Sequence, residues 1–306
     1  MKQIGTLAVP AVGIGCNNFG QLLDQSRTDD VVAAALDAGV AYFDTAAAYA
    51  GGQSEVLLGR ALGPRRDKAI IATKWGHTSG LRPGERGGDP ARIRASLEAS
   101  LKRLGTDWID HYQMHRPDPD TPIAETLGCL EELKAEGKIR EIGCTHFTAA
   151  QLRQSHAADR LAGWPSIQNQ YSMLTRTPET DGVLDACREL GVAFIPYFPL
   201  EAGLLTGKYT SVDAPPDGSR LKAVGAERAA QFLTADNLAV VRRLEAWAAD
   251  HGRTILELAM SWLATNPPVS TIIAGATTPA QVNANAAAAG WALTGSQRSE
   301  VAALLG

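Results

Sequence analysis

The sequence predicts an α/β fold, a single (β/α)8 TIM barrel that spans residues 1–306. Three observations lead to this prediction. Short apolar runs of strand length alternate with helix-like segments along the whole chain. The alternation repeats every ~30 to 40 residues, which suits a barrel of this chain length. Polar residues recur at the ends of the apolar runs, and in a barrel the carboxyl ends of all strands meet at one mouth.

Seven strands are predicted from apolar runs bounded by Gly, Pro or polar clusters. They cover residues 40–44, 69–74, 109–115, 138–143, 166–169, 192–197 and 270–274. An eighth strand is weaker by this criterion, because it requires either the turn after Asn18 or the division of a longer segment. A doubly wound sheet has the same alternation, but no Gly-x-Gly-x-x-Gly turn follows the first strand, so the barrel is favoured.

Helix-like segments lie between the predicted strands. The best supported covers residues 90–104, where Asp89 is placed to cap the N-terminus and Pro90 takes the first helical position. Another helix opens after Thr121 and Pro122. The other predicted helices cover residues 29–38, 54–62, 148–158 and 182–190, with one more from residue 279 and a last one from residue 295.

Composition and charge exclude several classes of protein. The formal net charge is -4, and charges of both signs are interspersed. Surfaces that bind nucleic acids or anionic membranes are basic, so we expect neither partner. The first residues lack a signal-peptide pattern, and no apolar run approaches the ~20 residues of a membrane span. We therefore expect a cytoplasmic protein that acts on a small molecule.

No metal site or disulfide framework is predicted. The cysteines are scattered without Cys-x-x-Cys spacing, so we expect them to be reduced and mostly buried. His111 and His115 are four residues apart, which is ~13 Å along a strand and too far for both to bind one ion. We therefore expect His111 to be a hydrogen-bonded histidine of the barrel interior. The four cysteines are Cys16, Cys129, Cys144 and Cys187.

Four residues at or near predicted strand ends form a set that can transfer a proton to a carbonyl oxygen. They are Asp44, Tyr49, Lys74 and His115. The phenol of a free tyrosine has a pKa of about 10, which makes it a poor acid near neutral pH. An adjacent ammonium lowers this pKa, and a carboxylate fixes the ammonium in place. We therefore expect Tyr49 to be the acid and His115 to donate a second hydrogen bond to the carbonyl oxygen.

Five stretches resemble the aldo-keto reductase signature, in the family's order and over nearly the whole chain. They cover residues 43–59, 73–76, 112–118, 168–172 and 199–209. The resemblance implies a β-hairpin at residues 2–9 that closes the bottom of the barrel, and it makes residues 12–15 the first of the eight strands. It also implies hydride transfer between a nicotinamide and the carbonyl carbon of an aldehyde, ketone or sugar, or the reverse oxidation of an alcohol or lactol.

The resemblance further implies which residues hold the cofactor. Gln168 is expected to bind the nicotinamide carboxamide, and Tyr197 is expected to stack on the ring. The loop at residues 200–208 is expected to lie along the pyrophosphate with its backbone N–H groups facing the anion. The other expected contacts are Thr145, His146, Leu200, Ala202, Gly203, Leu205, Lys208, Gly275, Thr277, Thr278, Gln281 and Asn285.

Two loops and two aromatic residues are expected around the pocket. Phe19 and Trp75 are expected to form an apolar wall for the substrate. The Gly-rich loop at residues 76–89 is expected to overhang the pocket, and the insertion at residues 209–235 to fold over the cofactor.

Two departures from the family pattern affect the cofactor. The family usually shows Gly-Val-Ser-Asn-Phe where residues 143–147 read Gly-Cys-Thr-His-Phe. Thr145 keeps a hydroxyl, and we expect protonation of His146 to affect cofactor binding near about pH 6 to 7. Residues 274–285 contain no Lys or Arg for a 2'-phosphate. NADP(H) is favoured by the resemblance, and NAD(H) is also possible because an unpaired phosphate binds less tightly.

Two other functions remain open at this point. Lys74 could form a Schiff base with a carbonyl substrate, as in aldolase barrels, although this leaves Gln168, Tyr197 and the loop at residues 200–208 without a role. Potassium-channel β subunits also resemble this family and act chiefly as binding partners. An acidic chain with no extra docking segment gives that role no support. The sequence specifies neither the substrate, nor the direction of the reaction, nor the oligomeric state.

Overall fold

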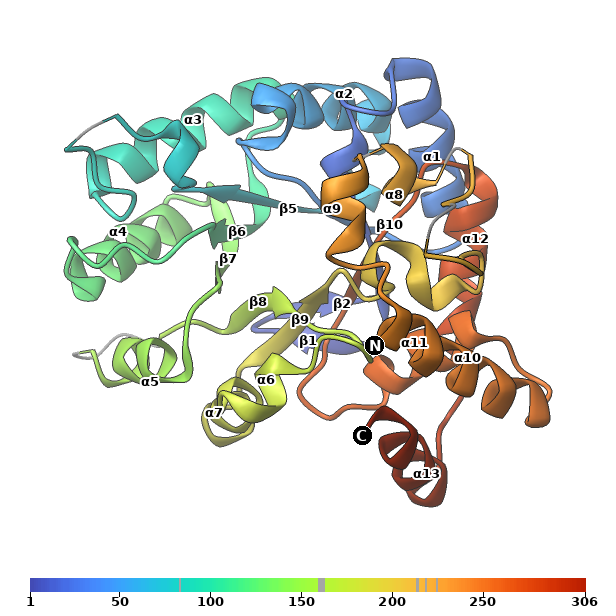
Figure 1. Cartoon of the computed structure of the whole chain (residues 1–306). Coiled ribbons are helices and arrows are strands. Elements are labelled where there is room, and N and C mark those ends of the chain that lie inside the picture. The colour runs from blue at the N-terminus through green and yellow to red at the C-terminus, as the bar shows by residue number, and fades with distance from the viewer. Residues whose placement is uncertain (83, 159–162, 213–214, 218, 224) are drawn as a thin grey trace.

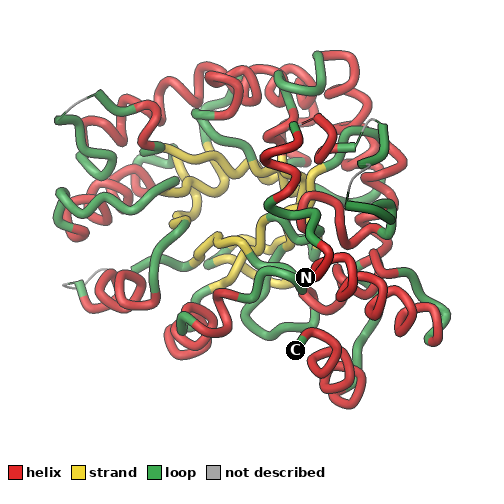
Figure 2. Tube along the Cα trace, viewed as in Figure 1, coloured by secondary structure: helices red, strands yellow, loops and turns green. Residues whose placement is uncertain are grey.

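The predicted barrel is confirmed by the computed structural model, which describes residues 1–82, 84–158, 163–212, 215–217, 219–223 and 225–306. Its strands are β3 (Val12–Gly15), β4 (Tyr42–Asp44), β5 (Ile70–Trp75), β6 (Ile109–Met114), β7 (Ile139–Thr145), β8 (Ser166–Gln170), β9 (Ala193–Tyr197) and β10 (Ile272–Gly275). They are parallel and close in the order β10-β3-β4-β5-β6-β7-β8-β9. Helices form the outer layer around them (Figure 1, Figure 2).

The hairpin implied by the family resemblance is present. Strands β1 (Lys2–Ile4) and β2 (Leu7–Val9) pair antiparallel, and Gly5 takes a φ of +53° in the turn between them. Ile4 and Val9 are fully buried, because they pack against side chains from the barrel interior and cover its lower end. Those side chains are Tyr42, Ala72, Ala193, Ile195 and Ile273.

The first strand of the barrel is Val12–Gly15, as the resemblance implies. This strand pairs with β10 on one side and with β4 on the other, and so closes the barrel. The alternative that used the turn after Asn18 is wrong, because Cys16–Asn18 forms a single 3-10 turn beyond the end of the strand.

Most of the predicted helices begin close to the predicted residue. Asp89 caps α3 by accepting hydrogen bonds from the backbone N–H groups of Ala91 and Arg92. Helix α1 begins earlier than predicted, because Asp24 caps it by accepting from the N–H of Arg27. These helices are α1 (Gln25–Asp37), α2 (Gln53–Leu62), α3 (Pro90–Leu104), α4 (Ile123–Ala135), α5 (Ala149–Ala157), α7 (Val183–Leu190), α12 (Pro279–Ala288) and α13 (Gly295–Leu305).

Two long helices were not predicted. Helices α10 (Ala235–Asp250) and α11 (Ile255–Ala264) lie between β9 and β10. The sequence carries their start signals, since Thr234 and Thr254 both cap their helices and Glu257 completes a capping box with Thr254. Three short helices were also missed, namely α6 (Thr177–Thr180), α8 (Arg220–Ala223) and α9 (Ala226–Ala230).

The cysteines behave as predicted, since all four are free and buried. In the part of the chain that the structure describes, no helix is both long enough and apolar enough to cross a membrane. The main hydrophobic core lies between the strands and the outer helices, and a smaller one fills the bottom of the barrel above the hairpin. The packed bottom leaves the carboxyl ends of the strands as the open end of the barrel.

Candidate active site

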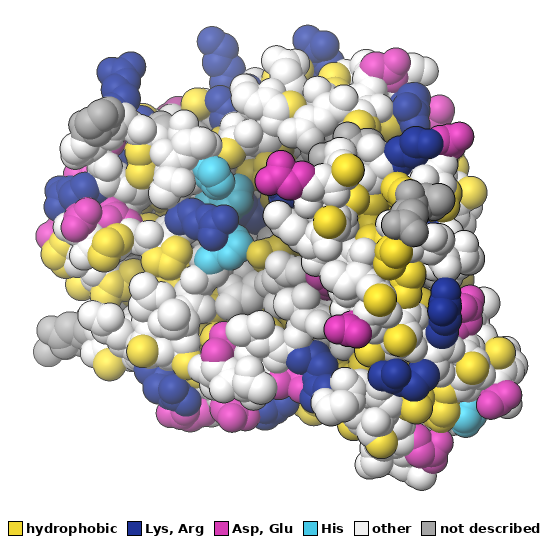
Figure 3. Space-filling view, in the orientation of Figure 1, with side chains coloured by type: hydrophobic (Ala, Val, Ile, Leu, Met, Phe, Trp, Pro, Cys, Tyr) yellow, Lys and Arg dark blue, Asp and Glu magenta, His cyan; other side chains and the backbone are white. Residues whose placement is uncertain are grey.

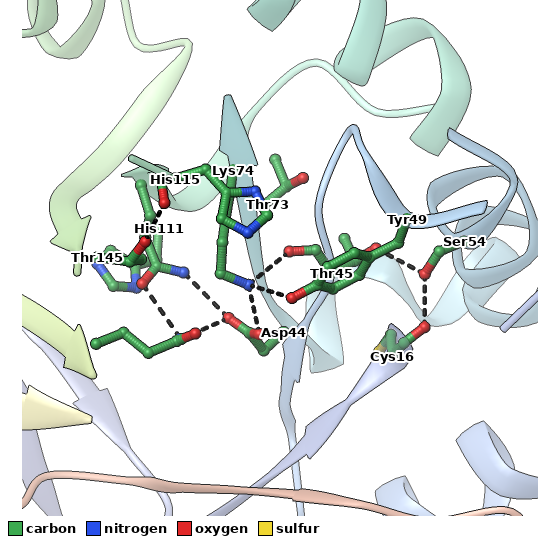
Figure 4. A network of polar contacts seen from close by, with 12 residues as sticks. Cys16, Asp44, Thr45, Tyr49, Ser54, Thr73, Lys74, His111, His115 and Thr145 are labelled. Carbon is green, nitrogen blue, oxygen red and sulfur yellow. Dashed lines mark hydrogen bonds and ion pairs between the residues drawn. The ribbon is translucent and has the colours of Figure 1, made fainter. Parts of the chain in front are cut away.

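A buried ion pair joins the ends of two neighbouring strands. Lys74 on β5 donates from Nζ to Asp44 Oδ2 at 2.5 Å and to the carbonyl oxygen of Thr45 at 3.0 Å (Figure 4). The two charged side chains are only 1% and 3% exposed. Burial, the largest single effect, lowers the pKa of Lys74, but the combined attraction and hydrogen bonds of Asp44 and Tyr49 outweigh it and raise this pKa above its ordinary value. Lys74 is therefore an ammonium, whereas a Schiff-base lysine has to present a neutral amine.

The second oxygen of the carboxylate is held by two amides from across the barrel. Asp44 Oδ1 accepts from Gln113 Nε2 at 3.1 Å and from Gln168 Nε2 at 2.9 Å. These amides come from β6 and β8, so the ion pair sits in a network that crosses the barrel interior. Gln168, expected to bind a carboxamide, thus donates to Asp44 and also lines the cavity described below. Both carboxylate oxygens are satisfied, as a buried charge requires.

Tyr49 reaches the ion pair from the loop that follows β4. Its hydroxyl accepts a hydrogen bond from Lys74 Nζ at 3.3 Å (Figure 4). The residue begins a 3-10 turn, η2 (Tyr49–Gly52), in which Ala50 takes a φ of 48°. A positive φ is uncommon for a residue with a side chain and is a form of strain found at functional sites.

The expected lowering of the pKa of Tyr49 is wrong. Burial of the phenolate raises the pKa of Tyr49 above its ordinary value, and this outweighs the opposite effect of the Lys74 ammonium. The sequence showed the neighbouring charge but not the extent of desolvation. The side chain is therefore a protonated phenol at neutral pH, the form in which it can give a proton away.

His115 faces Tyr49 as a neutral ring. The two rings meet edge to face, with centroids 5.8 Å apart. The histidine is 7% exposed. Burial, followed by the charge of Lys74, lowers the pKa of His115 to about 2. Its buried Nδ1 has no hydrogen-bond partner among the residues the structure describes. A neutral imidazole offers one N–H donor, which suits the expected hydrogen bond to a carbonyl oxygen.

A large cavity opens above these residues, with a volume of about 1210 Å³. Asp44, Tyr49 and His115 form part of its floor. The cavity extends to the loop after β9, to the insertion before α10 and to the loop after β10. Of the expected cofactor contacts, it is lined by Thr145, His146, Gln168, Tyr197, Leu200, Ala202, Gly203, Lys208, Gly275, Thr277, Gln281 and Asn285.

Four expected contacts do not line the cavity. Leu205 is fully buried, and the side chain of Thr278 caps α12 instead. The expectation that Phe19 and Trp75 form the substrate wall disagrees with the structure, because both side chains are at most 1% exposed. Trp75 stacks on Tyr112 and donates from Nε1 to the backbone of the loop that follows it. Aromatic character alone could not distinguish a packing residue from a lining one.

The loop after β9 is held by a buried carboxylate that sequence reasoning missed. Glu201 accepts hydrogen bonds from Ser172 Oγ at 2.5 Å, Thr175 Oγ1 at 3.0 Å and Gln170 Nε2 at 3.2 Å. It begins the 3-10 segment η5 (Glu201–Thr206). Positive φ angles in this loop turn successive peptide groups in a way that can form an anion-binding nest. They occur at Phe198, Glu201, Ala202 and Gly203.

Residues 145 and 146 line the cavity and also make contacts within the protein that the sequence did not predict. The hydroxyl of Thr145 donates to the carbonyl oxygen of His115 at 2.5 Å. The backbone N–H of His146 donates to Asn169 Oδ1 at 2.7 Å, and its φ is +62°. Burial, followed by the charge of Arg116, lowers the pKa of His146 to about 4. The expected protonation near about pH 6 to 7 is therefore wrong, because the free-histidine pKa of about 6.5 does not apply at this site.

Residues 274–285 contain no Lys or Arg, but cationic side chains from other segments of the chain line the same cavity. Arg27 at the start of α1 donates to the carbonyl oxygen of Thr277 at 3.4 Å. The insertion before α10 also lines the cavity, although residues 213–214, 218 and 224 of it lie outside the described residues. Only the folded chain brings these side chains together. The cations that line this end are Arg27, Lys208, Arg220, Lys222 and Arg228.

His111 is confirmed as a core histidine. Its Nε2 lies 2.9 Å from Ser166 Oγ and 3.2 Å from the carbonyl oxygen of Ile142, and its Nδ1 lies 2.7 Å from the hydroxyl of Tyr42. Since a carbonyl oxygen can only accept, Nε2 carries the proton. Burial lowers the pKa of His111 to about 3.

Comparisons with a family model, with protein sequences and with solved structures all point to the same family. The model of the aldo/keto reductase family matches residues 11–305. An Escherichia coli protein named NADH-specific methylglyoxal reductase is 37% identical over 283 residues, which cover 87% of this chain and 83% of that protein. An Arabidopsis thaliana protein named probable voltage-gated potassium channel subunit beta is 34% identical, with 87% and 83% covered. The holo structure of aldo-keto reductase AKR11C1 from Bacillus halodurans aligns with a TM-score of 0.79 at 30% identity, over 99% of this chain and 95% of that one.

The lowered histidine pKa values predict how stability depends on pH. Unfolding restores a pKa of about 6.5, so below that pH the unfolded chain binds protons that the folded chain does not. The free energy of unfolding should therefore fall as the pH falls from about 6.5, by up to about 1.4 kcal/mol per pH unit for a fully buried histidine such as His111. Urea unfolding at several pH values measures this slope.

The variant His146→Asn isolates the contribution of His146 to the pH dependence of the free energy of unfolding. We expect it to flatten the slope between about pH 6.5 and pH 4, the value to which the pKa of His146 is lowered, and to leave stability at neutral pH nearly unchanged. Because His146 is only half-buried, the change is smaller than for a fully buried ring. Identical slopes in the variant and the parent protein would contradict the lowered pKa.

Proposed function

This chain belongs to the aldo/keto reductase family, whose members are NAD(P)(H)-dependent oxidoreductases. From that premise we propose that it reduces the carbonyl group of an aldehyde, ketone or sugar, or oxidises the corresponding alcohol or lactol. Tyr49 is the general acid in reduction and the general base in oxidation. The observation that carries the proposal is the contact between the Tyr49 hydroxyl and Lys74 Nζ, 3.3 Å apart beside the floor of a large cavity.

Lys74 and Asp44 act on the state that follows proton transfer. When Tyr49 gives its proton to the carbonyl oxygen, a phenolate remains in a site where burial disfavours charge. The Lys74 ammonium stabilises this anion, and Asp44 keeps the ammonium charged and in place. The alkoxide that develops on the substrate is a far stronger base than a phenolate, so the transfer does not need a tyrosine pKa near 7.

His115 orients the carbonyl group. As a neutral ring it donates one hydrogen bond and adds no charge that would repel Lys74. Two donors, the Tyr49 hydroxyl and the His115 N–H, then meet at one oxygen. General acid catalysis of this kind typically contributes about 10²- to 10⁴-fold in rate.

The cavity fits a nicotinamide dinucleotide. When bound, the nicotinamide supplies or accepts the hydride at the carbonyl carbon. Tyr197 lies at the inner part of the cavity, where its ring meets His146 edge to face at 5.5 Å, and it is suited to stack on the nicotinamide. The positive-φ loop after β9 is suited to the pyrophosphate. The fit rests on these residues and on the cations at the outer end.

NADP(H) is the form of cofactor that the outer end favours. Arg27 contributes a guanidinium next to Thr277, where the sequence segment itself has no cation. Arg220 and Arg228 line the same end, whereas Lys222 is paired with Asp217. A 2'-phosphate carries about two negative charges near neutral pH and gains most from charge-assisted contacts with arginine.

Replacing Tyr49 by phenylalanine tests the proposed chemistry. With a panel of aldehydes that includes methylglyoxal, we expect Tyr49→Phe to lower kcat by at least about 10²-fold, because the variant has no proton to give. Its Kd for NADPH, measured by tryptophan fluorescence, should stay within about twofold, since no hydrogen bond to the cofactor is assigned to this hydroxyl.

Tyr112→Phe is the matched control for Tyr49→Phe. It removes a hydroxyl that, among the described residues, makes one hydrogen bond, a 3.4 Å contact with the carbonyl oxygen of Ile93, so the control should retain activity. Full activity in Tyr49→Phe, or binding of neither NADPH nor NADH to the parent protein, would refute the proposal.

The coenzyme preference has a separate test in Arg27→Gln. We expect the Kd for NADPH to rise about five- to tenfold and the Kd for NADH to stay nearly constant, because only NADPH has the 2'-phosphate. Arg140→Gln is the control, since Arg140 pairs with Asp110 near the start of β7, at the opposite end of the barrel. An equal loss of affinity for NADPH and NADH, or no loss of affinity for either, would count against this role of Arg27.

A further inference from the structure

We propose that the carbonyl substrate carries an oxyanion, a carboxylate or a phosphate, and that Arg116 binds it. This inference rests on the proposed function and adds the substrate class. Arg116 directly follows His115 at the carboxyl end of β6 and lines the same cavity as Tyr49 and His115. Figure 3 shows histidine side chains gathered around a cationic side chain on this face of the molecule.

The guanidinium of Arg116 has no protein partner in the described ranges of the chain. The nearest carboxylate in sequence, Asp118, is already engaged by the N–H groups of Gly88 and Asp120 and by the hydroxyl of Thr121. Arg116 is half-buried, so its donors are only partly hydrated. A guanidinium carries five N–H donors in a planar fork that matches an oxyanion. Such a group, left unpaired beside a cavity, is suited to a charged ligand.

The surroundings of Arg116 leave its charge uncompensated. The charge of Lys74 is balanced by Asp44 within hydrogen-bond distance. His115 and His146 are neutral, because burial first and neighbouring cations second lower their pKa values to about 2 and about 4. Arg116 therefore sets the sign of the electrostatic potential at this side of the mouth.

His77 packs against His115 beside this corner. Its ring meets that of His115 edge to face, with centroids 4.8 Å apart. The backbone N–H of Ser79 donates to Nδ1 at 3.1 Å, which leaves the ring proton on Nε2. Burial, and then the charge of Arg116, lowers the pKa of His77. The corner thus offers N–H donors and one positive charge, which together select an anion over a neutral group.

The anion that Arg116 binds belongs to the substrate rather than to the cofactor. In the closed order of strands, β6 lies four positions from β10, on the opposite side of the barrel. The segments suited to the cofactor phosphates follow β9 and β10, and they carry their own cations in Lys208 and Arg27. Arg116 instead lines the cavity together with Tyr49 and His115, the residues proposed to act on the reacting carbonyl group.

Matched pairs of anionic and neutral aldehydes test the inference. The first pair is 4-oxobutanoate and its methyl ester, and the second is glyceraldehyde 3-phosphate and glyceraldehyde. We measure kcat and KM with saturating NADPH for the parent protein, Arg116→Gln, Arg116→Lys and Arg153→Gln. Arg153 pairs with Glu189 on the outer surface of α5 and α7, so its replacement changes the net charge equally without touching the cavity.

We expect kcat/KM to favour the anionic member of at least one pair by about tenfold or more, as for one charge-assisted contact. The pair that shows the preference identifies carboxylate or phosphate as the group bound. Arg116→Gln should abolish this ratio through KM, Arg116→Lys should keep part of it, and Arg153→Gln should keep all of it. The ratio is the readout, because a merely structural role of Arg116 would affect both members of a pair alike.

Equal use of anionic and neutral aldehydes by the parent protein, or a preference that survives in Arg116→Gln, would overturn the inference and leave the proposed function standing. If none of the four aldehydes is reduced while NADPH binds, the result counts against the proposed function. Binding then decides the inference: acetate and inorganic phosphate are titrated into the complex with NADP+. Saturable binding of one of them that weakens at least about fivefold in Arg116→Gln supports it, and its absence overturns it.

Discussion

The buried ion pair between Lys74 and Asp44 is the interaction on which the rest of the site depends. Two charges this deeply buried persist only because every charged atom has a partner, and removing one member of such a pair typically costs about 3 to 5 kcal/mol. Lys74 occupies one carboxylate oxygen, and amides from β6 and β8 occupy the other. Four strands of the barrel therefore have to be in register before the pair can form, which links the geometry of the site to the closure of the fold.

Because the charges of Lys74 and Asp44 cancel, the groups proposed to touch the substrate carbonyl can all be neutral. Tyr49 keeps its proton, and His115 and His146 stay unprotonated, since charge is costly in this part of the barrel. Uncompensated cations lie farther out, on two sides of the cavity. One group lies near Thr277 at the outer end, and Arg116 lies across the mouth. The cavity thus has a neutral centre, where we propose proton transfer, and cations at its margins, where we propose the binding of anions.

The sequence predicted the barrel well, and it identified four residues that the fold brings together, Asp44, Tyr49, Lys74 and His115, because local patterns mark the ends of strands. It failed where an outcome depends on three-dimensional surroundings. Desolvation reversed the expected pKa shift of Tyr49. Trp75, expected to line the substrate pocket, is instead buried in the core. Arg27 lies close to Thr277 although 250 positions separate them in the chain, so no local pattern could connect them. The missed helices α10 and α11 are different, since their capping threonines were visible in the sequence.

The most direct test of the central role of the ion pair is the pH dependence of alcohol oxidation, in which the proposed mechanism requires Tyr49 to act as a phenolate. The rate is measured in single turnovers for the parent protein and for the double variant Lys74→Met with Asp44→Asn, which removes both charges and leaves no unpaired carboxylate. If Lys74 stabilises the phenolate, the apparent pKa in the double variant rises by about one unit or more and the rate at neutral pH falls accordingly. An unchanged pH profile would show that the ion pair supports the fold alone and does not tune the tyrosine.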